Sequence, residues 1–320
     1  MIRRFLTGLL VISCALAGSR EPITDQAYRV YRGNGTPATL DDVIAAARQV
    51  NVTFLGEAHD DPVAHYLEAQ ILKRVAGPDW ALSMEMFERD VQGVVDEYLN
   101  GLIDQSDLIA SGRAWGNYRT DYRPLLEIAK EQHLPVIAAN APKRYVDIVS
   151  RKGQPALLAL SPEAKRTLPP LPYAAASPAY RERFENEMSA EMGGANPGGK
   201  ADSKAAAGHE SEYALEAQSL WDATMADSIA TFLKEHPDKH ILQINGAFHS
   251  EYHQGILDHL ERYRPGTTTL VVTMLRNKSF PSWKEADMKD TGDFVIVTDP
   301  HIKPVRLKPL QGKGPGLSAP

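Results

Sequence analysis

Five short apolar runs rich in β-forming residues divide the sequence, and they constrain its fold more than any other feature. Near-continuous apolar runs of this length are typical of strands covered on both faces, as in a parallel sheet. The runs span residues 52–55, 81–84, 135–139, 241–244 and 269–272. Helical patterns lie between them, over residues 39–49, 64–75, 91–99, 122–132, 215–234 and 252–263. This alternation predicts an α/β fold with an open, mostly parallel sheet flanked by helices, to which 294–297 adds an edge strand.

The alternation stops between residues 152 and 215. This stretch is rich in proline at first, then carries a helical pattern over 179–192 and a run of small and polar residues typical of a mobile loop. We therefore predict a small helical insertion over 152–215, set into an α/β domain formed by 25–151 and 216–305. Residues 306–320 are rich in glycine, proline and lysine, and we expect a flexible tail there.

The first 17 residues have the pattern of a secretory signal. Arg3 and Arg4 precede the apolar run 5–12, which is far shorter than the roughly 20 residues of a membrane-spanning helix. The run 11–14 resembles a bacterial lipobox and ends at Cys14, the single cysteine of the chain. We expect Cys14 to be acylated with palmitate and to anchor the protein in the cell envelope, at the outer membrane facing the periplasm. The alternative is ordinary cleavage after residues 15–17, which discards Cys14.

The net charge and the cysteine content exclude several kinds of ligand and metal site. The formal net charge of −6 argues against broad non-specific nucleic-acid binding, which needs a clustered basic face. One cysteine excludes an intrachain disulfide and an all-thiolate zinc or iron–sulfur site within the chain. The ten histidines leave imidazole metal or haem chemistry open.

Polar side chains follow four of the predicted strands at the points where those strands end. They are Glu57 and His59, Glu85, Asn140 and His249. Because the carboxyl ends of parallel strands share one edge of a sheet, we expect these groups to converge on one crevice. Two imidazoles and two carboxylates there could bind a divalent metal or share a proton. The alternative is that they pair with one another and fix the loops.

A second candidate feature is the aromatic and basic segment that contains Tyr118 and Tyr122. It precedes a helix whose early proline suits a first turn. A tyrosinate can bind ferric iron axially, and a neighbouring arginine favours the phenolate. Composition alone favours a packed aromatic corner instead. His209 is the single histidine of the polar loop, and by itself it indicates an exposed residue.

These pieces, in this order, resemble the ChaN-like haem-binding uptake lipoproteins. The matching stretches are 55–59 (LGEAH), 85–87 (EMF), 118–127 (YRTDYRPLLE), 138–142 (AANAP), 217–226 (AQSLWDATMA) and 245–249 (NGAFH). The ordered set is specific although no single stretch is. The family is similar to a wider group with the TIKI metalloproteases and the erythromycin-esterase-like hydrolases.

The resemblance implies a periplasm-facing lipoprotein in which two subunits enclose a pair of stacked haems. A tyrosine of one subunit would ligate the iron, and a histidine of the other would come near it. The tyrosine falls on Tyr122 or Tyr118, with Tyr122 preferred, and the histidine on His209. The resemblance therefore predicts haem as cofactor, a homodimer joined by haem, and no metal besides the haem iron.

Two further functions stay open at this point. The first is a hydrolase, metal-dependent or acid–base, that uses Glu57, His59, Glu85 and His249. The second is an envelope protein with a vestigial hydrolase cleft. We favour haem binding and trafficking without chemistry, so that the protein is more a carrier than an enzyme.

Overall fold

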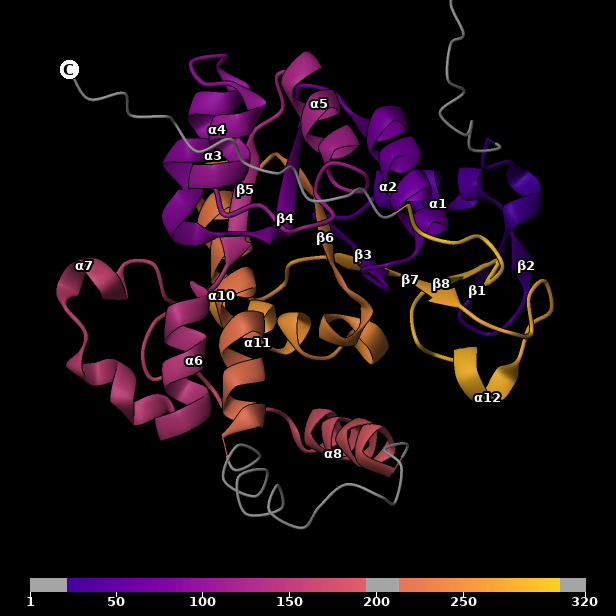
Figure 1. The fold of residues 1–320 in the computed structure, drawn as a ribbon. Coiled ribbons are helices and arrows are strands. Elements are labelled where there is room, and N and C mark those ends of the chain that lie inside the picture. Colours follow the sequence, from indigo (N-terminus) through magenta and orange to yellow (C-terminus); the bar gives the residue numbers. More distant parts are fainter. Residues whose placement is uncertain (1–21, 194–212, 306–320) are drawn as a thin grey trace, which may run out of the picture.

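The computed structural model describes residues 22–193 and 213–305. Its centre is an eight-stranded sheet with the strand order β2-β1-β8-β7-β3-β6-β4-β5 (Figure 1). The strands are β1 Tyr28–Arg32, β2 Pro37–Ala38, β3 Val52–Glu57, β4 Trp80–Glu88, β5 Val136–Asn140, β6 His240–Gly246, β7 Thr269–Arg276 and β8 Phe294–Thr298. Strands β3 to β8 run parallel, and β1 pairs antiparallel with β8 and β2. The predicted open, mostly parallel α/β sheet is therefore confirmed.

One detail of the predicted sheet is wrong. The segment 294–297 was expected at the edge of the sheet, but β8 lies inside it because β1 pairs along its outer side. The short β1 has a mixed burial pattern instead of a continuous apolar run. The segment 28–32 therefore lacks the continuous apolar run by which the central strands were predicted.

Helices fill the connections between the strands. The α-helices are α1 Leu40–Ala47, α2 Pro62–Val75, α3 Gln92–Leu99, α4 Gln105–Ser111, α5 Arg123–Glu131, α6 Lys143–Lys152, α7 Pro162–Lys165, α8 Pro178–Gly193, α10 Ala214–Glu235, α11 Ile256–Tyr263 and α12 Glu285–Met288. Short 3-10 turns are η1 Asp25–Ala27, η2 Arg89–Val91, η3 Gln154–Ala159, η5 Ala247–His249 and η6 Glu251–His253. No helix among these described residues is long and apolar enough to cross a membrane.

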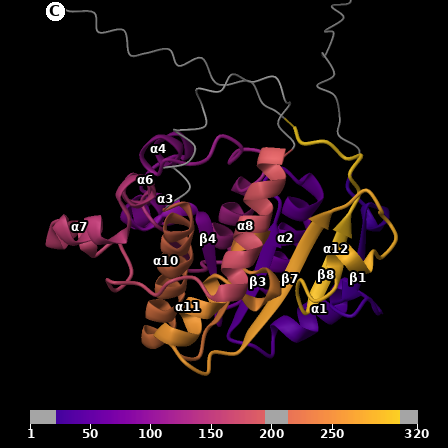
Figure 2. The ribbon, with the colours of Figure 1, turned by 90° about the horizontal axis from the view of Figure 1, so that it is seen from below.

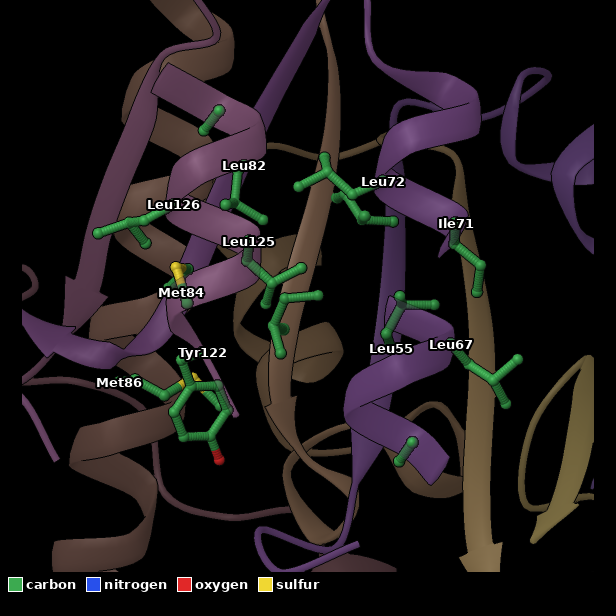
Figure 3. Packing of buried hydrophobic residues seen from close by; sticks show 14 of the residues in the cluster. Leu55, Leu67, Ile71, Leu72, Leu82, Met84, Met86, Tyr122, Leu125 and Leu126 are labelled. Carbon is green, nitrogen blue, oxygen red and sulfur yellow. The ribbon is translucent and has the colours of Figure 1, made fainter. Parts of the chain in front are cut away.

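The sheet is covered on both faces, as its apolar strands require. On one face Leu55 and Leu82 pack against Leu67 of α2 and Leu125 of α5 (Figure 3). On the other face Phe54, which directly precedes Leu55 in β3, packs with residues of α10 and α11. Successive side chains of a strand point to opposite faces, so a run that is apolar throughout supplies both cores. Each fully buried side chain of this size contributes roughly 1.5–3 kcal/mol.

A smaller apolar cluster lies beside the sheet. Residues of α6, η3 and the following loop pack there against the first turns of α10, through side chains such as Tyr145, Leu157 and Leu220. Farther along, α8 lies across the carboxyl ends of the strands (Figure 2). The boundaries 152–215 of the insertion stay a prediction, since α6 already contributes to this cluster. The predicted loop 193–208 falls almost wholly outside the described residues.

The free edge of the sheet at β5 is covered by a side chain. Gln92 of α3 donates a hydrogen bond from Nε2 to the Val136 carbonyl oxygen, at 2.8 Å. Its Oε1 accepts from the Ala138 amide at 2.7 Å. The side-chain amide thus takes both kinds of hydrogen bond that a neighbouring strand would make.

Candidate functional site

The carboxyl ends of β3 and β6 form one wall of a cleft of about 400 Å³. Glu57 ends β3 and pairs in register with Gly246, which ends β6. Helix α8 forms the opposite wall with Phe184, Glu187 and Met188. The crevice expected at the strand ends is therefore present. Its remaining lining residues are Ala58, His59, Gln218, Ala247, Phe248, His249 and Glu251.

His59 belongs to a row of three hydrogen-bonded groups. Its Nδ1 lies 2.9 Å from Glu57 Oε1. The same Oε1 accepts the hydroxyl of Tyr122 at 2.6 Å. Tyr122 stands at the N-cap of α5, whose early Pro124 suits the first turn. Because a carboxylate only accepts, Nδ1 of His59 carries a proton and Nε2 is the nitrogen that faces Glu85, 3.8 Å away.

His249 belongs to a second row with the same order of groups. Its Nδ1 lies 2.6 Å from Asp222 Oδ1. The other oxygen, Oδ2, accepts the hydroxyl of Tyr180 at 2.6 Å. Asp222 comes from α10 and Tyr180 from α8, so this row joins three segments that are far apart in the sequence. Nε2 of His249 faces Glu85 Oε1 at 3.6 Å.

Glu85 therefore lies between the two imidazoles. Its Oε1 faces both Nε2 atoms, while its Oε2 accepts the Gly246 amide at 2.7 Å. A Cβ at position 246 would lie 2.8 Å from His59 Nε2, so glycine there lets the imidazole lie close to the backbone. The predicted residues Glu57, His59 and His249 thus line one cleft, and Glu85 lies beside it between the two imidazoles. Their role in catalysis stays a prediction.

The charges of the cleft favour protonated imidazoles. Burial by itself would lower the pKa of His249, but the charges of Glu85 and Asp222 outweigh it and raise the pKa to about 9. Burial likewise opposes the charged form of His59, and the hydrogen bond to Glu57 with the charge of Glu85 raises its pKa. Glu85 therefore lies between two imidazoles whose pKa values are both raised.

Behind Glu57 lies a buried polar cluster. His65 Nε2 is 2.8 Å from Glu57 Oε2, and His65 Nδ1 is 3.5 Å from Asp121. Burial disfavours a charged His65, but Asp121 and Glu57 raise its pKa to about 11. Burial would raise the pKa of Glu57, yet its hydrogen bonds with His59 and His65 lower it to about 2. Burial and the charge of Glu57 raise the pKa of Glu68 well above its usual range.

Both predicted tyrosine ligands lie inside the protein. The ring of Tyr122 lies beside Met86 in the apolar cluster, with its oxygen turned away from Leu125 (Figure 3). Burial and the charge of Glu57 raise the pKa of Tyr122 far above its ordinary value. Burial raises the pKa of Tyr118 to about 12. In this conformation both side chains are neutral phenols without access to the surface.

The other predicted residues divide into two groups. Asn140 is buried at the end of β5, where its Oδ1 accepts the amide of Ala141 at 2.8 Å, and it does not line the cleft. His209 and Cys14 lie outside the described residues. Among the residues the structure describes, no group of three or more His, Cys, Asp or Glu side chains is arranged to hold a metal ion.

Sequence reasoning missed several residues of the site. Asp222 lies in the stretch 217–226 that carried part of the family resemblance, so its position was marked although its role was not. His65 stands six residues after His59, within the helical pattern 64–75, and its burial was the missing information. Tyr180 gave no signal, because its partner Asp222 is 42 residues away.

The cleft and its fold can be compared with known proteins. ChaN of Campylobacter jejuni, in a structure of cofacial haem binding, is 16% identical with a TM-score of 0.63; the match covers 87% of this chain and 100% of that chain. The type III effector HopBA1 (14% identity, 87% and 99% covered) and the erythromycin esterase mutant EreC (11%, 85% and 83%) have TM-scores of 0.45 and 0.43. Both values are too low to add to the fold assignment.

The family comparison covers more than half of the chain. No curated protein matches. A family model described as haem-binding uptake, Tiki superfamily, ChaN matches residues 43–260. This range runs from α1 to α11 and includes every residue of the two hydrogen-bonded rows. The chain belongs to the haem-binding uptake family of the Tiki superfamily, the ChaN family.

Proposed function

We propose that this protein binds haem and carries it in the cell envelope. The observation that supports this function is membership of the haem-binding uptake family over residues 43–260. The cleft adds a physical argument, because Phe184, Met188 and Phe248 offer apolar contact to a flat ligand. Bound haem would supply an iron centre that reports ligation through its absorption spectrum.

The residues for axial ligation do not fit haem in the conformation described. Tyr122 gives its hydroxyl to Glu57, and burial disfavours the phenolate that iron requires. Ligation by Tyr122 therefore requires that the hydrogen bond to Glu57 breaks and that residues 115–122 move. The tyrosinate, and the approach of His209 from a partner subunit, stay predictions that depend on this rearrangement.

A haemin titration followed by visible absorbance tests haem binding. We expect saturable binding with a shifted Soret band for the wild type. Tyr98→Phe is the matched control, because Tyr98 also donates its hydroxyl to a carboxylate, Glu127, at 2.6 Å. Absence of saturable binding contradicts the proposal. If Tyr122→Phe and Tyr118→Phe both keep the ferric spectrum of the wild type, the tyrosinate is wrong while haem binding stands.

Assembly and location form a separate part of the proposal. Cofacial haem binding by ChaN of Campylobacter jejuni supports a homodimer here that encloses two haems. We expect the mass from size-exclusion chromatography with light scattering to double on haemin addition. The lipobox-like run supports attachment through Cys14 and an outer-membrane location facing the periplasm. Mass spectrometry of the mature N-terminus tests this, and an unmodified N-terminus at Gly18 contradicts it.

A second candidate function is acid–base hydrolysis in the same cleft. The observation that favours it is Glu85 placed 3.6 and 3.8 Å from two imidazole nitrogens that are each held by a carboxylate. Such an arrangement suits a carboxylate base for a water molecule and an imidazolium acid for the leaving group. His249, with its pKa raised to about 9, is the acid in this scheme.

An ester panel tests the second candidate. We expect Glu85→Gln and His249→Asn each to abolish hydrolysis of the best ester, while haemin binding is retained. Gln154→Ala is a control outside the cleft, where Gln154 Nε2 donates to the Tyr173 carbonyl oxygen at 3.1 Å. If the wild type hydrolyses no ester above the rate of either variant, this function is wrong.

A further inference from the structure

Helix α8 contacts the strand ends through one stripe of side chains. Tyr180, Arg183, Phe184 and Met188 are buried or half-buried, whereas the described residues between them are exposed. Their spacing of three, one and four residues places them on one face of the helix. Two of them, Phe184 and Met188, line the cleft directly. The inner face of α8 is therefore part of the site.

Arg183 fixes this helix to the loop that follows β6. Its Nη2 donates to the Phe248 carbonyl oxygen at 2.7 Å, and its Nε donates to Gln254 at 3.1 Å. Its Nη1 lies 3.2 Å from Glu251, and its guanidinium covers the Phe248 ring at 4.0 Å. An arginine with every face engaged in this way sets one position of the helix, because its planar fork fits one arrangement of acceptors.

Tyr180 connects the same helix to His249. Asp222 is 1% exposed, and its two oxygens are divided between Tyr180 and His249, each at 2.6 Å. Gln218 Nε2 lies 3.3 Å from both the Tyr180 oxygen and His249 Nδ1. Gly255 leaves room for the phenol ring, since a Cβ there would lie 3.0 Å from Tyr180 Cε2. A buried carboxylate with one oxygen unpaired is costly and free to turn, so the hydroxyl fixes its orientation.

We propose that Tyr180 is a positioning residue for His249, so that docking of α8 builds the cleft wall and orients the imidazole in one step. The expected effect on reaction rate rests on the proposed acid–base function. The expected orientation of His249 does not depend on that function. A row of phenol, carboxylate and imidazole leaves His249 Nε2 as the nitrogen presented to Glu85 and to a substrate. Loss of the phenol oxygen would leave Asp222 held by fewer groups and widen the range of imidazole orientations.

The test compares two tyrosines that both lie beside Arg183. Tyr180→Phe removes the hydroxyl bound to Asp222 and keeps the ring. Tyr252→Phe is the control, because its ring also lies near Arg183, at 5.5 Å, but Tyr252 is 41% exposed and outside the row. The first readout is the His249 Nδ1–H proton signal in NMR spectra and its exchange rate with water. The second is the split between kcat and KM for the best ester.

We expect Tyr180→Phe to shift the His249 Nδ1–H signal and to speed its exchange about tenfold, as for the loss of one hydrogen bond. It should also lower kcat about tenfold with little change in KM, and Tyr252→Phe should change neither. An unchanged His249 signal in Tyr180→Phe overturns the inference. If Tyr180→Phe does not fold, Arg183→Lys weakens the docking instead, and an unchanged signal there overturns it equally. A shifted signal in a protein without esterase activity supports the positioning and contradicts the acid–base function alone.

Discussion

His59 and His249 stand in rows of the same order, tyrosine then carboxylate then imidazole, but the rows are built differently. The carboxylate of the first row is Glu57, which belongs to β3 and is also bound by His65. The carboxylate of the second is Asp222, which depends on Tyr180 from α8. The carboxylate of the first row thus belongs to the sheet, whereas that of the second belongs to α10 and takes its phenol partner from α8.

The two imidazoles also differ in their exposure to solvent. The side chain of His59 is 41% exposed, whereas that of His249 is 9% exposed. The ring of Trp115 packs edge-on against His59 at 4.9 Å, which leaves one side of the imidazole open. The more accessible imidazole is thus held by a carboxylate of β3, and the enclosed imidazole by a carboxylate of α10.

The largest expected difference between the rows is in stability. Glu57→Ala leaves the imidazolium of His65 buried with one weak partner, so we expect a loss of about 3–5 kcal/mol in the free energy of unfolding. Asp222→Ala removes a partner of His249 that still faces Glu85, and its loss should be smaller. Urea unfolding followed by circular dichroism measures both. A larger loss for Asp222→Ala would show that the second row is the more rigid one.

A second prediction concerns pH. The pKa of His249 is raised from 6.5 to about 9. Its protonation therefore stabilises the folded protein fully below pH 6.5, and this stabilisation is lost as the pH rises to 9. The shift corresponds to about 3 kcal/mol as an order of magnitude. We expect His249→Asn to make the decline between pH 6.5 and 9 less steep. The decline due to His65, whose pKa is about 11, should persist in that variant up to higher pH.

Thermal unfolding at a series of pH values measures this dependence. The comparison of His249→Asn with His65→Asn separates the contributions of the two histidines to the pH dependence. Equal profiles for wild type and His249→Asn between pH 6.5 and 9 would contradict the raised pKa of His249.

A third prediction concerns a substitution that should move His59 and leave His249 in place. In Gly246→Ala the new Cβ would lie 2.8 Å from His59 Nε2 but 3.6 Å from His249 Cδ2. We expect the His59 ring to move toward solvent and stability to fall by about 1–3 kcal/mol, as in other overpacked sites. NMR signals of the His59 ring should shift while those of His249 stay near their wild-type positions. Shifts of equal size at both rings would show that the two rows respond as one unit.

The smallest expected effect compares the two phenols. Tyr122→Phe leaves Glu57 with two histidine partners, so we expect a loss of about 1 kcal/mol in stability. Tyr180→Phe leaves Asp222 with fewer partners and should cost more. Chemical denaturation of the two variants side by side measures the difference. The reverse order would mean that Glu57 depends on its phenol more than Asp222 does.

The sequence predicted the parts of the fold that depend on local pattern. The central strands and the capped helix that begins after Thr39 are present because apolar runs and the Thr39–Asp42 capping box are local signals. The crevice residues of β3, β4 and β6 were found because strand ends are readable from the sequence. β1 was missed because it is short and half exposed.

The remaining parts of the site depend on contacts between distant residues. Tyr180 reaches Asp222 across 42 residues, and Tyr122 reaches Glu57 across 65. The tyrosine segment was interpreted as a ligand surface, but its buried hydroxyl serves Glu57 in the described conformation. Hydrogen-bond partners of this kind follow from how helices pack on the sheet, and residue spacing along the chain does not specify that packing.

The Gln92 side chain at the free edge of the sheet has a consequence for solubility. An uncovered edge strand is a template on which another chain can add a strand, and β5 is the last strand in the order. Gln92 occupies the Val136 carbonyl and the Ala138 amide, the groups that such a chain would pair with first. In Gln92→Ala both groups become available while the fold keeps its core. We therefore expect Gln92→Ala to self-associate at lower protein concentration than the wild type.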